Sequence, residues 1–336
     1  MNILLTGGTG YIGSHTAVVL AKAGHQVVLL DNLCNSLHRV VGCIEQIIGA
    51  PVTFVQGDVR DTQLLIDVMK SHHIDAVMHF AGLKAVGESV TNPLLYFSNN
   101  VQGAISILQA MQEAQVEVFV FSSSATVYGE PLYLPYDESH LTNPINPYGD
   151  TKLGVEILLR ALPNSDPAWK IACLRYFNPV GAHVSGLIGD DPSGIPGNLM
   201  PYLARVASGR LDCLNIFGND YGTRDGTGER DYIHVMDLAE GHMAALEFLD
   251  KNSGFHVVNL GTGSPVSVLD CVKAFESASG KSVPLHFSSR RQGDLPIYYA
   301  NADLAQKKFG WTAKRSLVEM CESAWNFQKN QDHNKF

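Results

Sequence analysis

The chain has 336 residues, about twice the length of a typical single domain, so we expect one large α/β unit with a smaller attached lobe. Hydrophobic residues make up 45% and charged residues 17% of the sequence, which excludes an intrinsically disordered chain. Lys and Arg number 24 against 33 Asp and Glu, the net charge is −9 and no basic block occurs, so neither nucleic acid nor an anionic membrane is an expected partner.

The six cysteines form no CxxC pair and show no metal-ligand spacing. They are Cys34, Cys43, Cys173, Cys213, Cys271 and Cys321. This pattern indicates a reducing compartment, no disulfides and no bound metal. Residues 1–7 read as a strand entering a glycine turn rather than as a signal peptide, and no apolar run approaches the ~20 residues that span a bilayer. We therefore expect a cytoplasmic protein.

Short apolar runs alternate with stretches of helical spacing through the first half of the chain. The runs lie at 3–5, 27–30, 53–55, 76–80, 118–121 and 171–174, and the clearest helical stretches lie at 11–23, 64–70 and 94–114. This alternation predicts βαβ units and a parallel sheet. Because the runs are apolar on both faces, helices should cover both sides, as in a Rossmann-type doubly wound sheet.

The regular alternation of apolar runs and helical stretches ends after residues 178–181, and Gly and Pro are frequent from 181 to 201. We place the main boundary there, with a Rossmann domain at 1–180 and a smaller C-terminal α/β lobe that binds substrate at 181–336. Helical spacing recurs at 198–208, 235–249 and 317–327, and an apolar run occupies 257–260. That run could return to the first sheet, so the two lobes can be discontinuous in sequence.

A glycine-rich turn follows the first predicted strand, with Gly7, Gly10 and Gly13 in a GxxGxxG pattern. A bound dinucleotide needs glycine there for a sharp turn, close approach of the diphosphate and tight packing of the next helix. The diphosphate would meet free N–H groups at that helix N-terminus. A tight strand-to-helix turn alone could explain the glycines, but Asp31 ends the next strand where such sites hold the ribose.

Asp31 indicates NAD rather than NADP, because a carboxylate accepts hydrogen bonds from ribose hydroxyls and repels a 2′-phosphate. Arg39, the nearest basic residue downstream, is too distant in sequence to reverse that preference. Asp58 ends the third strand and could reach the adenine, although a surface turn explains it equally well. The small residues Ala81 and Gly82 end the fourth strand beside the expected cofactor, or form an ordinary strand end.

Tyr148 and Lys152 are four residues apart, hence on one helical face, and Asn146 and Pro147 make a suitable N-cap and first turn. A free phenol with a pKa near ~10 is a poor base at neutral pH. Positive charge from Lys152 and from oxidised nicotinamide should lower that pKa. Ser124 would donate a hydrogen bond to the reacting oxygen. A solvated helix face and a serine turn are the plain alternatives.

Together these motifs resemble the extended short-chain dehydrogenase/reductase family, which carries GxxGxxG, a catalytic Ser or Thr and YxxxK. Further segments resemble the UDP-glucose 4-epimerases of that family, and the resemblance covers nearly the whole chain. The segments are 10–16, 31–36, 79–89, 122–129, 174–183, 228–237 and 290–294.

The resemblance implies specific site residues. Besides the three glycines, Ala81 and Gly82, and the catalytic Ser124, Tyr148 and Lys152, it places NAD against Tyr11, Ile12, Asp31, Asn32, Asn35, Ser36, Asp58, Val59, Phe80, Lys84, Asn99 and Phe177. It places the UDP-sugar against Ser124, Tyr148, Asn178, Asn198, Leu199, Phe217, Arg230, Tyr232, Arg291, Asp294 and Tyr298. It also implies a homodimer, with the helices near 94–114 and 148–161 available for the contact.

The resemblance further implies an isomerase of galactose metabolism, which interconverts UDP-galactose and UDP-glucose through a 4-keto intermediate while NAD stays bound. Arg230 and Arg291 suit a diphosphate and Asp294 a ribose, although either arginine alone is more often a surface residue. Gly197 stands where the family often has a second Asn, which puts one sugar contact in doubt. The bulk of Tyr298 predicts a preference for sugars without an N-acetyl group.

Two other functions remain open from the sequence. A dehydratase or net dehydrogenase of the same fold is one, but a dehydratase typically carries an Asp-Glu pair after the catalytic hydroxyl residue, where this chain has Ala125 and Thr126. The other is a catalytically silent NAD-binding module, which would have no need to keep Ser124, Tyr148 and Lys152 together.

Overall fold

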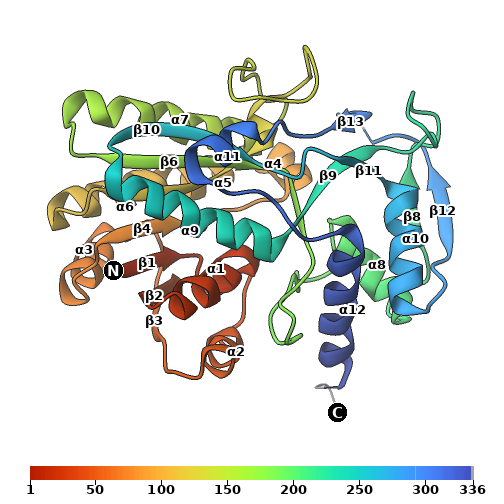
Figure 1. The fold of residues 1–336 in the computed structure, drawn as a ribbon, viewed down its shortest axis with the longest axis horizontal. Coiled ribbons are helices and arrows are strands. Elements are labelled where there is room, and N and C mark those ends of the chain that lie inside the picture. The colour runs from red at the N-terminus through yellow and green to blue at the C-terminus, as the bar shows by residue number, and fades with distance from the viewer. Residues whose placement is uncertain (292, 334–336) are drawn as a thin grey trace.

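The computed structural model describes residues 1–291 and 293–333. Gln292, within the resembling segment 290–294, and residues 334–336 of the predicted lobe lie outside the described residues. A large layered domain and a smaller lobe lie side by side, with the N-terminus in the first and α12 (Leu317–His333) in the second (Figure 1). Among the described residues no helix is both long and apolar enough to cross a bilayer.

The large domain is built on a seven-stranded parallel sheet in the order β10-β6-β5-β4-β1-β2-β3. Its strands are β1 (Asn2–Thr6), β2 (Gln26–Asp31), β3 (Thr53–Gln56), β4 (Ala76–His79), β5 (Val118–Ser124), β6 (Lys170–Tyr176) and β10 (Gly254–Leu260). The inner strands are buried over nearly their whole length, as apolar runs covered on both faces require. The prediction of a doubly wound parallel sheet is confirmed.

Helices cover both faces of this sheet. One layer holds α1 (Tyr11–Lys22), α2 (Arg39–Ile48), α9 (Val235–Lys251) and α11 (Asp303–Phe309). The opposite layer holds α3 (Thr62–Ser71), α6 (Gln102–Ala114) and α7 (Pro147–Ser165), and α4 (Val86–Thr91) and α5 (Pro93–Tyr96) contact α7. Each layer forms its own apolar core against one side of the strands, so the two faces are packed independently.

The single helix expected at 94–114 is wrong, because a π-helical turn at Phe97–Val101 separates α5 from α6. The wider turn carries Asn100, which is buried and donates through its side-chain amide to the Leu83 carbonyl and the Thr151 hydroxyl. Its carbonyl accepts from the Leu83 N–H at 2.8 Å. The irregular turn therefore ties the loop after β4 to α7, and such turns are frequent at functional sites.

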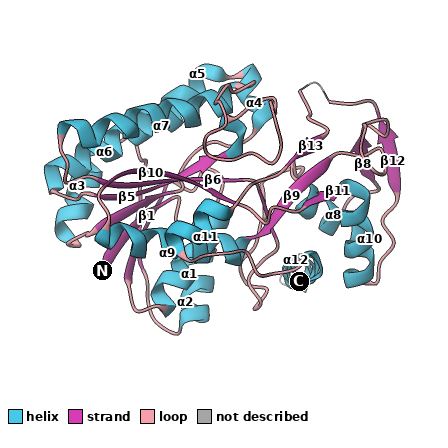
Figure 2. Cartoon of the chain, turned by 45° about the horizontal axis from the view of Figure 1, so that its top comes forward, coloured by secondary structure: helices cyan, strands magenta, loops and turns pink. Residues whose placement is uncertain are grey.

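The smaller lobe has its own core between short sheets and three helices (Figure 2). The helices are α8 (Leu199–Ala207), α10 (Val268–Ser279) and α12 (Leu317–His333). In one sheet β9 (Glu229–His234) pairs with β7 (Asn178–Val180), β11 (Pro265–Ser267) and β13 (Ile297–Tyr298), and in the other β8 (Leu214–Phe217) pairs with β12 (Leu285–Ser288). In the large domain, a short 3₁₀ helix at Ala125–Val127 follows β5.

The second half of the chain also contributes to the large domain. The run expected to return does so, because β10 pairs in parallel with β6 at the edge of the seven-stranded sheet. α9 packs on α1, and its apolar side chains join the core beneath that helix. The chain thus crosses between the two parts several times, and the division at residue 180 stays a prediction.

Candidate active site

The glycine turn connects β1 to α1 and leaves no room for side chains. Gly7 has a φ of +70°, and a Cβ there would lie 2.6 Å from the Ala81 amide nitrogen. A Cβ on Gly13 would collide with the Gly7 carbonyl oxygen. Gly10 caps α1 without a side-chain hydrogen bond, so the first N–H groups of the helix are left for a ligand. The turn fits a diphosphate at a helix N-terminus.

Asp31 ends β2 beside this turn, and its carboxylate is fixed by its own neighbours. One oxygen accepts from the Leu33 N–H at 2.9 Å and the Ser36 hydroxyl at 3.0 Å, and the other accepts from the Thr9 N–H at 3.2 Å. The second oxygen keeps capacity for further donors. A carboxylate held in this way suits two ribose hydroxyls and disfavours a phosphate.

Asp58 lies one strand further along the same edge. It accepts from the Asn32 side-chain amide at 3.1 Å, and hydrogen bonds from Arg60 hold the pKa of its carboxyl far below its usual value. Asp58 is therefore an anion that positions Asn32. Arg39, in turn, pairs with Asp191 across the cleft at 3.0 Å.

These elements surround a cleft of about 770 Å³ at the carboxyl ends of the strands. That volume lies in the range of natural cofactor sites, and the position is where open parallel sheets bind ligands. The predicted NAD residues that line it are Gly7, Gly10, Tyr11, Ile12, Gly13, Asp31, Asn32, Asn35, Ser36, Val59, Phe80, Ala81, Gly82, Lys84 and Asn99. Asp58, Ser124, Tyr148, Lys152 and Phe177 do not line it directly.

A loop from the smaller lobe, residues 190–197, forms the opposite wall of the cleft. The Ser193 hydroxyl donates to the Asn35 side chain at 3.4 Å, and Lys84 approaches Asp190 at 3.7 Å. Together with the Arg39–Asp191 pair, these contacts join the loop to the dinucleotide domain. We refer to residues 190–197 as the crossing loop.

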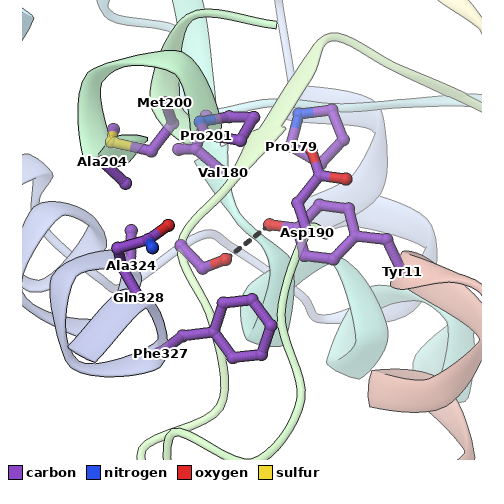
Figure 3. Close-up of a pocket in the computed structure, with 11 residues that line it drawn as sticks. Tyr11, Pro179, Val180, Asp190, Met200, Pro201, Ala204, Ala324, Phe327 and Gln328 are labelled. Atoms are coloured by element: carbon purple, nitrogen blue, oxygen red, sulfur yellow. Dashed lines mark hydrogen bonds between the residues drawn. The ribbon is translucent and has the colours of Figure 1, made fainter. Parts of the chain in front are cut away.

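A smaller cavity of about 20 Å³, the room of roughly one water, lies where α1 meets the smaller lobe (Figure 3). There the Tyr11 hydroxyl donates to the Gly181 carbonyl at 2.7 Å. Burial raises the pKa of Tyr11, with a further contribution from Asp190, so the phenol remains a donor. The cavity is too small for a substrate. The hydrogen bond to Gly181 holds the Tyr11 side chain in place beside the glycine turn.

The catalytic candidates come from β5 and α7. Asn146 caps α7 by accepting from the Gly149 N–H at 2.9 Å, which places Tyr148 and Lys152 in the first two turns. The buried Lys152 ammonium donates to the Ser122 carbonyl at 2.6 Å and lies 5.9 Å from the centre of the Tyr148 ring. A Cβ on Gly82 would lie 3.8 Å from the same ammonium. Lys152 therefore lies directly behind Gly82 and Ser122, which line the cleft.

Burial changes the pKa values of both Tyr148 and Lys152. Burial raises the pKa of Tyr148 to about 12, and a hydrogen bond with Ser124 opposes that change. Burial lowers the pKa of Lys152 to about 8, and Glu156 opposes it. In the chain by itself, burial outweighs the hydrogen bond from Ser124, so the Tyr148 pKa is raised. The lowering expected from Lys152 together with an oxidised nicotinamide stays a prediction. A phenolate at neutral pH requires additional positive charge beside the ring.

The predicted UDP-sugar residues lie mainly on the short strands of the smaller lobe. Arg230 on β9 is the strand neighbour of Tyr298 on β13. Asn198 caps α8, of which Leu199 is the first residue, and lines the cleft. Phe217 ends β8, and the Arg291 guanidinium carbon lies 3.7 Å from the centre of its ring. Asp294 is exposed, and its backbone N–H donates to the Arg291 carbonyl at 3.3 Å.

Two of the residues predicted for the UDP-sugar, Tyr232 and Tyr298, pack among apolar side chains. Tyr232 is buried in the core of the smaller lobe next to Cys271, although its strand neighbour is the predicted Asn178. Tyr298 packs 5.1 Å from the Phe177 ring, in an apolar cluster with Tyr136 and the residues after Ser124, and its buried hydroxyl has no partner. The structure thus brings Tyr298 and Phe177 together, whereas Tyr232 faces the lobe interior.

Three residues of this region were not among the predicted site residues: Ser123, Glu156 and Arg175. Glu156 is buried on α7 one turn beyond Lys152, and Arg175 is buried on β6. Two signals were available in the sequence. Glu156 continues the Tyr148–Lys152 spacing of four, and Arg175 is a charge that ends an apolar strand, which requires a buried partner.

The family comparison agrees with this arrangement. Residues 4–324 match the family model described as GDP-mannose 4,6 dehydratase. The UDP-glucose 4-epimerase of Yersinia pestis is 54% identical over 98% of this chain and 97% of its own length. Among the described residues, no group of three His, Cys, Asp or Glu is placed to hold a metal.

Two solved structures are similar over almost every residue. The UDP-glucose 4-epimerase of Stenotrophomonas maltophila, with bound NAD and formylated UDP-arabinopyranose, has a TM-score of 0.98 at 50% identity, covering 99% of both chains. The enzyme of Bifidobacterium longum, in complex with NAD+ and UDP, has a TM-score of 0.96 at 47% identity, covering 100% of both. With relatives this similar over its whole length, the chain belongs to the UDP-glucose 4-epimerases of the extended short-chain dehydrogenase/reductase family.

Proposed function

We propose that this chain is an isomerase that interconverts UDP-galactose and UDP-glucose at C4, through a transient 4-keto sugar, in galactose metabolism. The observation that carries the proposal is one arrangement. A cleft that fits a dinucleotide has Gly82 and Ser122 in its lining, and Lys152 lies directly behind these two residues. Lys152 lies beside Tyr148, which is hydrogen-bonded to Ser124. The cofactor is NAD, bound through the residues predicted for it.

The cofactor site supports NAD on physical grounds. The glycine turn accepts a diphosphate, and the fixed Asp31 carboxylate accepts ribose hydroxyls. Bound NAD supplies the acceptor, and then the donor, of the hydride at the sugar C4. Because that hydride returns in every cycle, no added cofactor is consumed.

Tyr148 acts as the base. Its phenolate oxygen takes the proton from the sugar 4-hydroxyl and later returns it, while Ser124 donates a hydrogen bond to the same sugar oxygen. The pKa of about 12 must fall for this task. The Lys152 ammonium and a positive nicotinamide ring provide the charge that lowers it. Lys152 is held for this role by the Ser122 carbonyl.

The smaller lobe anchors the nucleotide. Arg230 and Arg291 present planar cations for the diphosphate, and Phe217 presents an aromatic face at the end of β8. With the UDP held by these remote contacts, the 4-keto sugar can turn and take the hydride on its other face. Binding energy away from C4 is thereby used to hold an intermediate that has few contacts of its own.

A dehydratase is the second candidate, because the matched family model carries that description. Elimination of water needs an acid and a base directly after the catalytic hydroxyl residue. Here Ala125 is buried, and the Thr126 hydroxyl donates to the Ser124 oxygen at 2.9 Å. Neither supplies a carboxyl group. Accumulation of a 4-keto-6-deoxy sugar would favour this candidate, and accumulation of NADH would favour a net dehydrogenase.

The proposal includes a cytoplasmic homodimer. The six cysteines are free thiols, which supports a reducing compartment. Apolar side chains are exposed together on neighbouring helices, with Leu94 on α5 85% exposed, Val90 on α4 62% and Ile157 on α7 52%. An exposed apolar face of this kind suits a second copy of the chain. Light scattering of wild type and Leu94→Asp would test it, with a shift to monomer expected.

The test of the function uses the purified protein, UDP-galactose and no added cofactor. The expected result is conversion to an equilibrium mixture that contains UDP-glucose, with no net NADH. The same mixture should form when the reaction begins from UDP-glucose. Failure of both reactions by protein shown to contain NAD would refute the proposal.

A further inference from the structure

The inner face of α7 carries three functional groups in successive turns. Tyr148, Lys152 and Glu156 follow one another at intervals of four, so they share one side of the helix. Lys152 and Glu156 are 5% and 4% exposed. A carboxylate this deeply buried needs charged or hydrogen-bonding partners, which makes its surroundings informative.

The Glu156 carboxylate is held by two neighbouring strands. Arg175 on β6 binds it through both oxygens, with Nε 3.0 Å from Oε1 and Nη2 2.5 Å from Oε2. The Ser123 hydroxyl on β5 donates to Oε1. Ser123 and Arg175 are paired residues of adjacent strands. The carboxylate therefore joins α7, β5 and β6 at one point.

That point is directly next to the proposed catalytic groups. Ser122, before Ser123, accepts the Lys152 ammonium on its carbonyl, and Ser124, after Ser123, hydrogen-bonds Tyr148. A shift of α7 along the sheet would change both contacts. The bidentate Arg175 pair is a rigid connection, because the planar guanidinium matches the carboxylate in one orientation.

We infer that Glu156 is a positioning residue of the active site, whose carboxylate, fixed by Arg175 and Ser123, holds Tyr148 and Lys152 in register with Ser124 and places negative charge beside the Lys152 ammonium. The inference rests on the proposed epimerase function.

The groups that face Lys152 from the other elements leave this electrostatic role to Glu156. His79 on β4 is neutral, since burial and Lys152 lower its pKa to about 3. The Cys173 thiol on β6 is neutral because burial raises its pKa, and the Tyr148 pKa is about 12. Arg175 lies beyond the carboxylate and binds it. Glu156 therefore opposes the effect of burial on Lys152, and loss of its charge should lower the Lys152 pKa below about 8.

The pair could instead serve stability alone, and the two roles predict different results. Buried ion pairs often contribute little net stability, and apolar replacements of similar volume are tolerated. A purely structural pair would leave the pH dependence of turnover unchanged in any variant that folds. A positioning pair would change it.

The experiment measures kcat and KM for UDP-galactose from pH 6 to pH 10, with melting temperature and NAD content, in wild type and Glu156→Gln. We expect kcat at pH 8.5 to fall roughly tenfold or more and KM to stay within about twofold. The alkaline limb of the pH profile, in which kcat falls as pH rises, should begin at least about one pH unit lower. Glu156→Asp should restore the limb, because it keeps the charge. An unchanged limb and kcat in Glu156→Gln would overturn the inference.

The matched control is Asp237→Asn. Asp237 is also a fully buried carboxylate bound by an arginine, Arg315, but it lies in the first turn of α9 in the other helical layer. We expect this variant to melt at lower temperature with the wild-type alkaline limb. If the two variants shift the limb equally, the role of Glu156 is general stability and the inference fails.

A second variant and a second readout keep the outcomes separate. If Glu156→Gln fails to fold, the double variant Glu156→Met, Arg175→Met decides, and wild-type kcat and alkaline limb in the folded double variant would refute the inference. NMR titration of the Lys152 ammonium, assigned with Lys152→Met, needs no turnover, and we expect it to move to lower pH in Glu156→Gln. A shifted titration in a protein that does not convert UDP-galactose would reject the epimerase function alone.

Discussion

The part of this molecule predicted to bind the dinucleotide and the part predicted to bind the substrate are assembled differently. In the first, side chains such as Asp31, Asp58 and Ser124 lie at the ends of parallel strands, so one regular sheet brings them to one edge. In the second, Asn198, Phe217 and Arg230 come from a helix start and two separate short sheets. The first, regular half therefore takes its side chains from one edge of one sheet, whereas the second, irregular half takes them from separate short elements. Substitutions in the two halves should therefore have different kinetic signatures.

The largest effect is expected in the regular half. Tyr148→Phe removes the base, and kcat should fall roughly 10²–10⁴-fold while NAD content and UDP affinity stay near wild type. Turnover assays would measure kcat, an assay of bound NAD would measure the NAD content, and calorimetry would measure the UDP affinity. Near-normal activity of this variant would show that another group takes the proton.

Acid should destabilise the sheet domain. His15, His79 and His242 are buried around the seven-stranded sheet, and burial lowers their pKa values to about 3, 3 and 4. Because unfolded histidine binds a proton below about pH 6.5, each destabilises the fold by up to ~1.4 kcal/mol per pH unit as pH falls from 6.5 toward its folded pKa. Above pH 6.5 this loss is absent.

Denaturant unfolding at pH 7 and pH 5 would measure this loss. His79→Gln should reduce the pH dependence, whereas the exposed His73→Asn should not. An equal pH dependence in all three proteins would contradict the assignment to buried imidazoles.

A smaller, purely kinetic effect is expected in the irregular half. Arg291→Ala removes a cation proposed for the diphosphate, so KM for UDP-galactose should rise about 10–100-fold, with NAD content unchanged. The neighbouring Arg290→Ala is the control, because Arg290 pairs with Asp220 on the surface at 2.8 Å. Equal KM values for the two variants would remove Arg291 from the site.

The smallest effect concerns selectivity. Tyr298 fills an apolar cluster with Phe177 and Tyr136, and a smaller residue would leave room for an acetamido group. We expect Tyr298→Ser to raise kcat/KM for UDP-N-acetylglucosamine roughly tenfold, with a modest loss for UDP-glucose. Assays with both substrate pairs would measure this. The idea fails if the ratio of the two kcat/KM values does not change.

The sequence predicted the regular half well, because βα alternation is a local signal. The first six strands and α1 lie within a few residues of the predicted ranges. The error at 94–114 arose because nothing in helical spacing marks a π-turn, which here is accompanied by contacts of Asn100 with Leu83 in the loop after β4 and with Thr151 on α7. In the smaller lobe, β9 begins with three charged residues and β13 has only two residues, so neither forms an apolar run.

The site followed the same division. The glycine turn and the Tyr148–Lys152 spacing carry their physical reason in the sequence, whereas the UDP-sugar residues came from family resemblance alone. Long-range partners were not predictable, because Glu156 meets Ser123 across 33 residues and Arg175 across 19. The effect of burial on the Tyr148 pKa was also not predictable, because burial is a property of the folded chain.

The crossing loop has a consequence for the lifetime of the holoenzyme. It closes the cleft against Asn35, Arg39 and Lys84, so a dinucleotide lying beneath it would be released only when several weak polar contacts open together. Dissociation would then be much slower than each catalytic cycle. The protein should leave a desalting column still carrying its dinucleotide, and Asp191→Ala should shorten that residence time.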